Sequence, residues 1–217
     1  MSDTQNTARN IRWTIFACVV FMAAAVALVV NKLVTPRVMS NDELRINGAL
    51  IFEQPRRFEA FELLDQNGET FTQDDFKGHW SLLFFGFTHC PDICPTTMAE
   101  MSRLMGALPE PIAADTEVML FSLDPARDTP AIMKEYVAYF GDDFIGVTGE
   151  FLTMRRFANQ VNVAFSKVTQ GDDYTVDHSG NIVIINPRGD YHGFFKPPFE
   201  LAKLKATFSS IYQSFDG

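Results

Sequence analysis

Hydrophobic residues follow two patterns along this chain: one unbroken run near the amino terminus and many short runs after it. The long run, Trp13–Val30, contains no charged side chain, and further apolar residues occur close by, at Ile11 before it and at Leu33-Val34 after it. A helix of that length crosses a hydrocarbon core of about 30 Å. The pattern therefore predicts a single transmembrane anchor over residues 13–34, preceded by a short tail at residues 1–12.

A cleaved signal peptide is the alternative interpretation of this run. The triplet Ala25-Val26-Ala27 fits an A-x-A cleavage site. Three apolar residues, Leu28 to Val30, continue the run beyond that site. This continuation favours an anchor over a cleaved leader.

The segment after the anchor, residues 35–55, is polar and is interrupted by Pro36, Gly48 and Pro55. Because it shows no sustained hydrophobic period, we expect a tether there. The remainder, residues 56–217, is long enough for one globular domain of about average size.

Short apolar runs alternate with amphipathic stretches through residues 56–217. The expected strands are two short ones on either side of an Asn67-Gly68 turn, then Ser81–Phe87, Glu117–Leu123, Phe144–Val147, Asn181–Asn186 and Tyr191–Phe195. The expected helices are Pro95–Leu108, Pro130–Phe140 with Thr129 as its N-cap, Glu150–Asn159 and Phe199–Phe215. Residues 161–177 are too long for a simple connection, and we expect an inserted hairpin or ordered loop there. This order predicts an α/β fold with a mixed central sheet flanked by helices.

The charge balance excludes one class of partner. The chain carries 18 Lys and Arg residues against 27 Asp and Glu residues, a formal net charge of -9. Neutralising phosphates requires clustered cations. We therefore expect no nucleic-acid partner.

Two cysteines, Cys90 and Cys94, lie between the end of the first buried strand and the start of a helix. Unpaired amide N–H groups and the positive end of the helix dipole favour thiolate over thiol at such a place. Thiolates are nucleophiles in disulfide exchange and also soft ligands for copper. Three intervening residues favour metal binding over the closer spacing of most redox motifs, although both chemistries stay open. A thiol pair after the first buried strand makes the predicted fold thioredoxin-like.

Polar residues around the thiols are candidates for supporting roles. His89 adjoins Cys90, but adjacent side chains on an extended chain point in opposite directions, so we expect it beside the site and not as a ligand. Asp124 and Asp128 follow a neighbouring strand, where they either form hydrogen bonds near the site or cap the next helix. His178 lies in a turn directly before a buried strand, and a polar loop residue is its plainer interpretation.

Three motifs, FTHCPDICPTT, SLDPARDTP and YTVDHSGNI, occur in this order. Together they resemble the Sco/SenC family of copper-binding cytochrome oxidase assembly proteins, and the likeness covers residues 55–215. The resemblance implies a membrane-tethered thioredoxin-like domain that binds one copper ion, Cu(I) or Cu(II), through Cys90, Cys94 and His178. We expect Asp177 or another acceptor to orient the His178 ring through its second nitrogen.

The resemblance also implies a function. Family members help to metallate the binuclear copper centre of cytochrome c oxidase subunit II, so a copper metallochaperone with no turnover of its own is expected, serving that subunit or another copper protein together with other copper carriers. The alternative is an enzyme, a thiol:disulfide oxidoreductase that keeps a partner's cysteines reduced. His178 favours copper, because disulfide exchange needs two thiols and no imidazole ligand.

The location follows from the anchor and the thiols together. Basic residues occur on both sides of the anchor, so the positive-inside rule does not decide its orientation. A working thiol pair suggests a domain outside the cytoplasm, where cysteines are oxidised. We expect a single-pass protein of the inner (cytoplasmic) membrane with its domain on the periplasmic side.

Overall fold

A computed structural model describes residues 2–34, 38–171 and 173–215. The chain divides into two compact units, Met1–Val38 and Met39–Gly217. The first contains one helix, α1 (Ser2–Val34). Within the described residues, its segment Ile11–Val30 is the one stretch long and apolar enough to cross a membrane. Its side chains are exposed along that segment.

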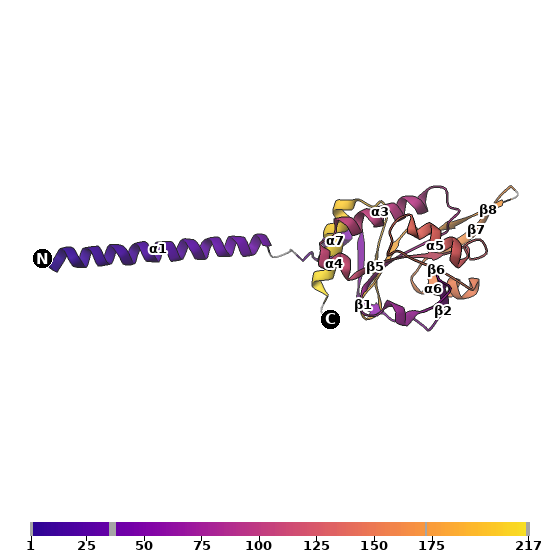
Figure 1. Cartoon of the computed structure of the whole chain (residues 1–217), viewed down its shortest axis with the longest axis horizontal. Helices are drawn as coiled ribbons and strands as arrows, with labels where there is room; N and C mark the ends of the chain where they lie inside the picture. The colour runs from indigo at the N-terminus through magenta and orange to yellow at the C-terminus, as the bar shows by residue number, and fades with distance from the viewer. Residues whose placement is uncertain (1, 35–37, 172, 216–217) are drawn as a thin grey trace. The chain divides into compact units, whose positions relative to one another are not determined.

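The second unit is built on a mixed sheet (Figure 1). Its strands are β1 (Ala49–Arg56), β2 (Glu62–Asp65), β3 (Thr70–Thr72), β4 (Trp80–Gly86), β5 (Thr116–Ser122), β6 (Ile145–Thr148), β7 (Phe165–Gln170), β8 (Asp173–His178), β9 (Ile182–Ile185) and β10 (Tyr191–Phe195). Its helices are α2 (Asn41–Ile46), α3 (Ile93–Ala107), α4 (Glu110–Ala114), α5 (Pro130–Ala138), α6 (Phe151–Gln160) and α7 (Leu201–Ser214), with a 3-10 turn η1 (Gln73–Phe76).

Among the described residues, eight strands form one sheet in the order β1-β10-β9-β4-β5-β6-β2-β3. The pairs β4–β5 and β5–β6 are parallel, and the remaining pairs are antiparallel. Strands β7 and β8 pair with each other as a separate antiparallel hairpin. The domain therefore has the expected thioredoxin-like arrangement of a mixed sheet flanked by helices.

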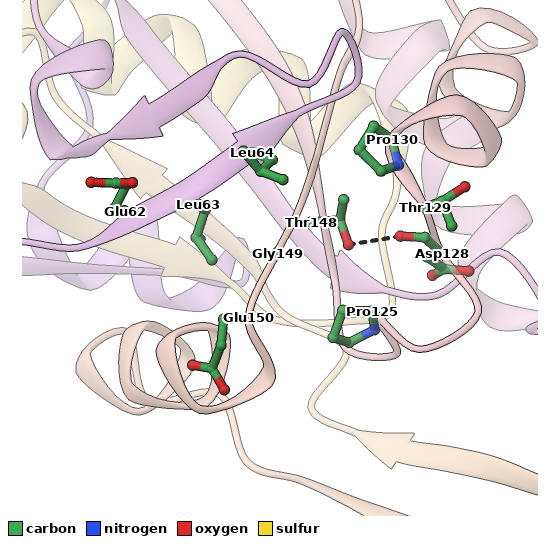
Figure 2. Close-up of a pocket in the computed structure, with 10 residues that line it drawn as sticks. All are labelled: Glu62, Leu63, Leu64, Pro125, Asp128, Thr129, Pro130, Thr148, Gly149 and Glu150. Atoms are coloured by element: carbon green, nitrogen blue, oxygen red, sulfur yellow. Dashed lines mark hydrogen bonds between the residues drawn. The ribbon is translucent and has the colours of Figure 1, made fainter.

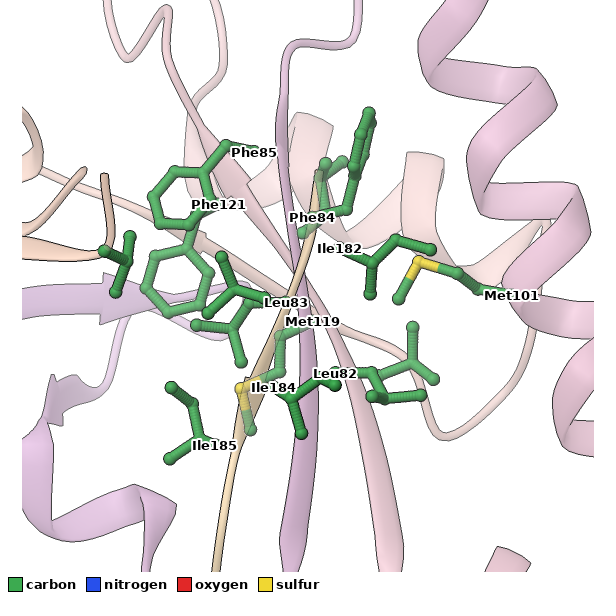
Figure 3. Close-up of a cluster of buried hydrophobic side chains, with 14 of the residues drawn as sticks. Leu82, Leu83, Phe84, Phe85, Met101, Met119, Phe121, Ile182, Ile184 and Ile185 are labelled. Carbon is green, nitrogen blue, oxygen red and sulfur yellow. The ribbon is translucent and has the colours of Figure 1, made fainter. Parts of the chain in front are cut away.

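The core lies on both faces of β4, which is buried along its whole length (Figure 3). Successive side chains of a strand point to opposite faces. On one face, Trp80 packs against Phe208 of α7. On the other, Phe85 packs against Phe121 of β5 and Phe157 of α6. With partners on both faces, the carboxyl end of β4 is held in a fixed position for the segment that follows.

Most predicted elements are confirmed. Gly68 has a φ of 82° in the turn between β2 and β3, a conformation that favours glycine. Thr129 caps α5, because its side chain accepts a hydrogen bond from the Ile132 backbone N–H. The long segment at residues 161–177 contains the expected inserted hairpin, β7–β8.

The segment after α1 differs from the predicted tether over residues 35–55. Residues 35–37 lie outside the described residues, but α2 begins at Asn41 behind a capping box formed by Ser40 and Glu43. Strand β1 follows and pairs with β10 at the edge of the sheet. The apolar part of this edge strand, Ala49–Phe52, is only four residues long, and a run that short does not by itself distinguish a strand from other structure.

Candidate metal centre

The thiol pair lies where β4 passes into α3. The chain turns after β4 with a hydrogen bond from the Cys90 backbone N–H to the Phe87 carbonyl (3.2 Å). Cys94 is the second residue of α3 and is fully buried, whereas Cys90 is half-buried. Both are free thiols. The strand-to-helix position predicted from the sequence is thus confirmed, with one sulfur reachable from solvent and the other enclosed.

Gly86, the last residue of β4, makes room for the buried sulfur. A β-carbon at this position would lie 2.9 Å from Cys94 Sγ and 3.1 Å from the Phe84 ring. Carbon and sulfur cannot approach so closely without displacement. A residue without a side chain therefore lets the sulfur rest directly against the strand.

The protonation of Cys94 corrects an expectation from the sequence. Burial raises the pKa of the Cys94 thiol far above its usual range, and the neighbouring Cys90 adds to the rise. A backbone hydrogen bond with Phe87 opposes this rise but does not cancel it. The helix start therefore does not produce a thiolate at Cys94, because removing the sulfur from water outweighs the helix dipole. Without a bound cation, Cys94 is a neutral thiol at neutral pH.

His178, the last residue of β8, brings an imidazole to this sulfur. Its Nε2 lies 3.5 Å from Cys94 Sγ, and its ring packs edge-on against Phe84 and Phe87 at centroid distances of 5.8 and 6.2 Å. Its Nδ1 is 3.1 Å from the Ser179 carbonyl oxygen, which can only accept a hydrogen bond, so Nδ1 carries the proton. The Nε2 lone pair is therefore directed at the sulfur.

The electrostatic surroundings keep this ring neutral. Burial lowers the pKa of His178, while the hydrogen bond to Ser179 and the charge of Asp177 act in the opposite direction. The sequence predicts Asp177 or another acceptor as the group that orients the ring, and in the structure that acceptor is the Ser179 carbonyl. A neutral imidazole with a free Nε2 is the form that binds metals.

Asp128 anchors the loop that leads to the thiols. It is fully buried, and its carboxylate accepts hydrogen bonds from the Thr88 backbone N–H (3.1 Å), the Thr88 hydroxyl (2.6 Å) and the Ser122 hydroxyl (2.6 Å). His89 is half-exposed, with Nδ1 3.0 Å from Thr88 Oγ1 and 3.8 Å from Asp128. Both residues therefore lie beside the thiol loop, and Asp128 holds it in place.

Asp124 has a different partner set. Its buried carboxylate accepts hydrogen bonds from the Tyr174 hydroxyl at 2.9 and 3.1 Å and from Arg127. Tyr174 belongs to β8, the strand that ends in His178. Neither carboxylate serves merely as a helix cap, because Thr129 has that role for α5.

The turn that carries both aspartates is tied to the sheet. The Thr148 hydroxyl donates a hydrogen bond of 2.7 Å to the Asp128 backbone carbonyl (Figure 2). A pocket of about 390 Å³ next to this turn is lined by residues of β2, β6 and the loops after β5 and β6. Neither thiol nor His178 lines this pocket, so it is separate from the candidate centre. His178 instead lines an open groove of about 450 Å³ at the base of the β7–β8 hairpin.

The three expected donors are near one another but do not form a closed cage. Among the described residues, no group of three His, Cys, Asp or Glu side chains is arranged to hold a metal ion as it stands. Cys94 and His178 are in contact, and Cys90 is close enough to Cys94 to influence its pKa. Two soft sulfur donors and one imidazole suit copper, and Cys90 is the partly exposed member of the set.

Several residues near the site were missed at the level of sequence. The Tyr136 hydroxyl is buried without a hydrogen-bond partner among the described residues. Its pKa is raised by burial, with smaller contributions from both thiols and Asp128. Arg127, Tyr174, Ser179 and Gly86 were likewise missed. Arg127, Tyr174 and Ser179 stand inside two of the three motifs, whereas nothing in the local pattern marks Tyr136 and Gly86.

The fold and the site together define a class of protein. It is a thioredoxin-like domain with two cysteines where β4 passes into α3 and a histidine in contact with Cys94. The family model described as SCO1/SenC matches residues 53–213, and the chain belongs to this family.

Individual relatives agree with this assignment. A Stutzerimonas stutzeri protein named "Putative copper-binding protein" is 40% identical over 163 residues, which are 75% of this chain and 80% of that protein. The structure of Bradyrhizobium japonicum ScoI with copper bound is 35% identical, with a TM-score of 0.61 over 71% of this chain and 97% of that one. Yeast Sco1 with copper bound is 29% identical, with a TM-score of 0.68 over 75% of this chain and 91% of that one.

Proposed function

We propose that this protein is a copper metallochaperone that binds one copper ion through Cys90, Cys94 and His178. The observation that carries the proposal is the contact of 3.5 Å between His178 Nε2 and Cys94 Sγ, with the ring proton held on Nδ1 by Ser179. Disulfide exchange needs two thiols and no imidazole, although a histidine can serve it as a base that activates a thiol. Copper binding uses all three groups, because thiolates and imidazole are ligands that copper prefers.

Cu(I) and Cu(II) place different demands on these donors. Two thiolates satisfy Cu(I), while Cu(II) takes additional nitrogen or oxygen donors. The buried Cys94 thiol must lose its proton for copper to bind, so uptake releases protons. We propose that the half-buried Cys90 meets the incoming copper first, and that the cargo passes to cytochrome c oxidase subunit II or another copper protein during assembly of its binuclear copper centre.

Copper titration of the purified full chain in detergent tests this function. We expect saturation at about one copper per chain for both Cu(I) and Cu(II), with a thiolate-to-Cu(II) absorption band in the second case. Blocking the thiols by alkylation beforehand provides the control and is expected to remove both signals. Equal binding before and after alkylation would place copper elsewhere and contradict the proposal.

A thiol:disulfide oxidoreductase is the second candidate. The two cysteines are free and close enough for Cys90 to affect the pKa of Cys94, as an exchanging pair requires. The buried, protonated Cys94 disfavours this function, because the thiolate is the nucleophile in exchange.

We further propose that residues 13–34 anchor the chain as a single pass in the inner membrane, with the domain on the periplasmic side. The apolar segment Ile11–Val30 supports this proposal by its length and composition. We expect the full chain to stay with the membrane fraction after washing at high salt, because about 20 apolar residues insert stably. A soluble mature form that begins near Leu28 would instead indicate a cleaved signal peptide.

A further inference from the structure

The imidazole at the candidate centre belongs to a hairpin that has no strand partner in the main sheet. Among the residues that the structure describes, strands β7 and β8 pair only with each other, and Figure 1 shows them extending beyond the body of the globular unit. All but the first residue of β7 are exposed. At its base the hairpin is closed by hydrogen bonds between Ala164 and Ser179. Something outside the hairpin must therefore determine where His178 lies.

One side-chain cluster connects this hairpin to the turn after β5. Asp124 accepts hydrogen bonds from the Tyr174 hydroxyl and from Arg127 Nε. Arg127 also donates to the Tyr174 carbonyl through Nη2 and to Asp173 through Nη1, each at 3.3 Å. Its guanidinium lies 4.0 Å from the centroid of the Tyr174 ring. We call Asp124, Arg127 and Tyr174 the hairpin latch.

Burial makes this cluster stronger than a surface ion pair. The side chains of Asp124 and Arg127 are 1% and 19% exposed. A buried carboxylate needs its partners, since losing one leaves it incompletely satisfied. Arg127 also lies 5.9 Å from the ring centroid of Phe87, which packs against His178. The latch thus contacts both the hairpin and a residue that touches the imidazole.

The turn after β5 also holds the loop that carries the thiols. Asp128 accepts a backbone hydrogen bond and a hydroxyl hydrogen bond from Thr88, two residues before Cys90. The Asp124 backbone carbonyl accepts hydrogen bonds from the Arg127 and Asp128 backbone N–H groups, both 3.0 Å long, which makes the turn rigid. The thiol loop and the hairpin are therefore fixed to two ends of one short turn.

We propose that Arg127 and Tyr174 are positioning residues, which hold the β7–β8 hairpin so that the His178 imidazole stays against Cys94. Neither side chain supplies a ligand. Releasing either one lets the hairpin move relative to the turn and carries His178 away from the sulfur. The consequence for copper rests on the proposed function, whereas the positioning of His178 does not.

The first test needs no copper. In the full chain in detergent, we expect Arg127→Gln and Tyr174→Phe to speed amide hydrogen exchange across residues 165–178 by about tenfold, while β4 and β5 keep their exchange rates. We also expect faster acylation of His178 by diethyl pyrocarbonate, because the ring would no longer be packed against Phe84 and Phe87. Lys167→Gln is the matched control. The Lys167 ammonium also contacts the Tyr174 ring, at 3.7 Å from its centroid, but the side-chain partners of Asp124 in the latch are Arg127 and Tyr174.

Each outcome of this test decides the matter. Unchanged exchange in both latch variants would overturn the proposal, as would faster exchange with unchanged acylation of His178. Faster exchange in β4 and β5 as well would indicate general destabilisation and would also overturn it. If Arg127→Gln fails to fold, Tyr174→Phe carries the same test, because it removes a single hydroxyl group.

The second test uses aqueous Cu(II) and Cu(I) with the same variants. We expect Arg127→Gln to weaken Cu(II) binding by about 10- to 100-fold, the usual effect of losing a group that orients a ligand. Binding of Cu(I), which two thiolates satisfy, is expected to change by less than about threefold. Unchanged Cu(II) affinity would overturn the proposed role. If the unmodified chain binds no copper, the proposed function fails, while exchange and acylation still decide the positioning role.

Discussion

Cys94→Ser is expected to abolish tight copper binding, lowering the affinity for both oxidation states by more than about 100-fold. The change removes a soft donor outright, whereas losing a group that only orients a ligand already costs about 10- to 100-fold. Cys90→Ser is expected to have the same effect, because a single thiolate and an imidazole leave too few ligands. Isothermal titration or competition with a chromogenic chelator measures both affinities.

The third cysteine provides the matched control for these variants. Cys18 is exposed on α1, within the apolar segment, and Cys18→Ser is expected to bind copper as the unmodified chain does. A thermal unfolding curve must accompany Cys94→Ser, because Cys94 is fully buried against Gly86 and the hydroxyl of serine costs about 1–3 kcal/mol without a partner. If a folded double cysteine variant held copper with unchanged affinity, the site would lie elsewhere.

His178→Ala is expected to separate the two oxidation states. Cu(II) affinity should fall by at least about tenfold with loss of its absorption spectrum, while Cu(I) affinity changes by less than about threefold. The reason is that the imidazole is the one nitrogen donor of the set and its Nε2 faces Cys94. Because the Ser179 carbonyl orients the ring, we expect Asp177→Asn to have little effect.

Another histidine provides the control for this variant. His79 directly precedes β4, at the opposite end of the strand from the thiols, and its Nε2 lies 3.0 Å from a Glu117 carboxylate oxygen. We expect His79→Ala to leave both copper affinities unchanged. Reduction of a disulfide peptide completes the comparison, and His178→Ala should leave it nearly unaltered. If the variant instead kept its Cu(II) spectrum and lost reductase activity, His178 would be a base that activates a thiol. The protein would then be better described as a thiol:disulfide oxidoreductase than as a metallochaperone.

Much of the fold could be predicted because its elements carry local signals. Strand β4 is an uninterrupted apolar run, and α5 begins with Thr129 and Pro130, an N-cap followed by proline at the first helical position. The length of residues 161–177 predicted an inserted hairpin or an ordered loop, and the structure has the hairpin. Strand β1 was not predicted, because its apolar run of four residues is short and its place in the sheet depends on pairing with β10, far along the chain.

The sequence by itself determined the chemical types at the centre: a C-x3-C pair at a strand-to-helix junction and a histidine before a buried strand. Only the tertiary structure decided their state. It brings His178 to Cys94 across 84 residues, assigns the ring proton through Ser179, and buries the Cys94 sulfur so deeply that its thiol keeps its proton. The physical reason is that desolvation and hydrogen bonding depend on atoms that are close in space, whereas residue type and periodicity are properties of the chain alone.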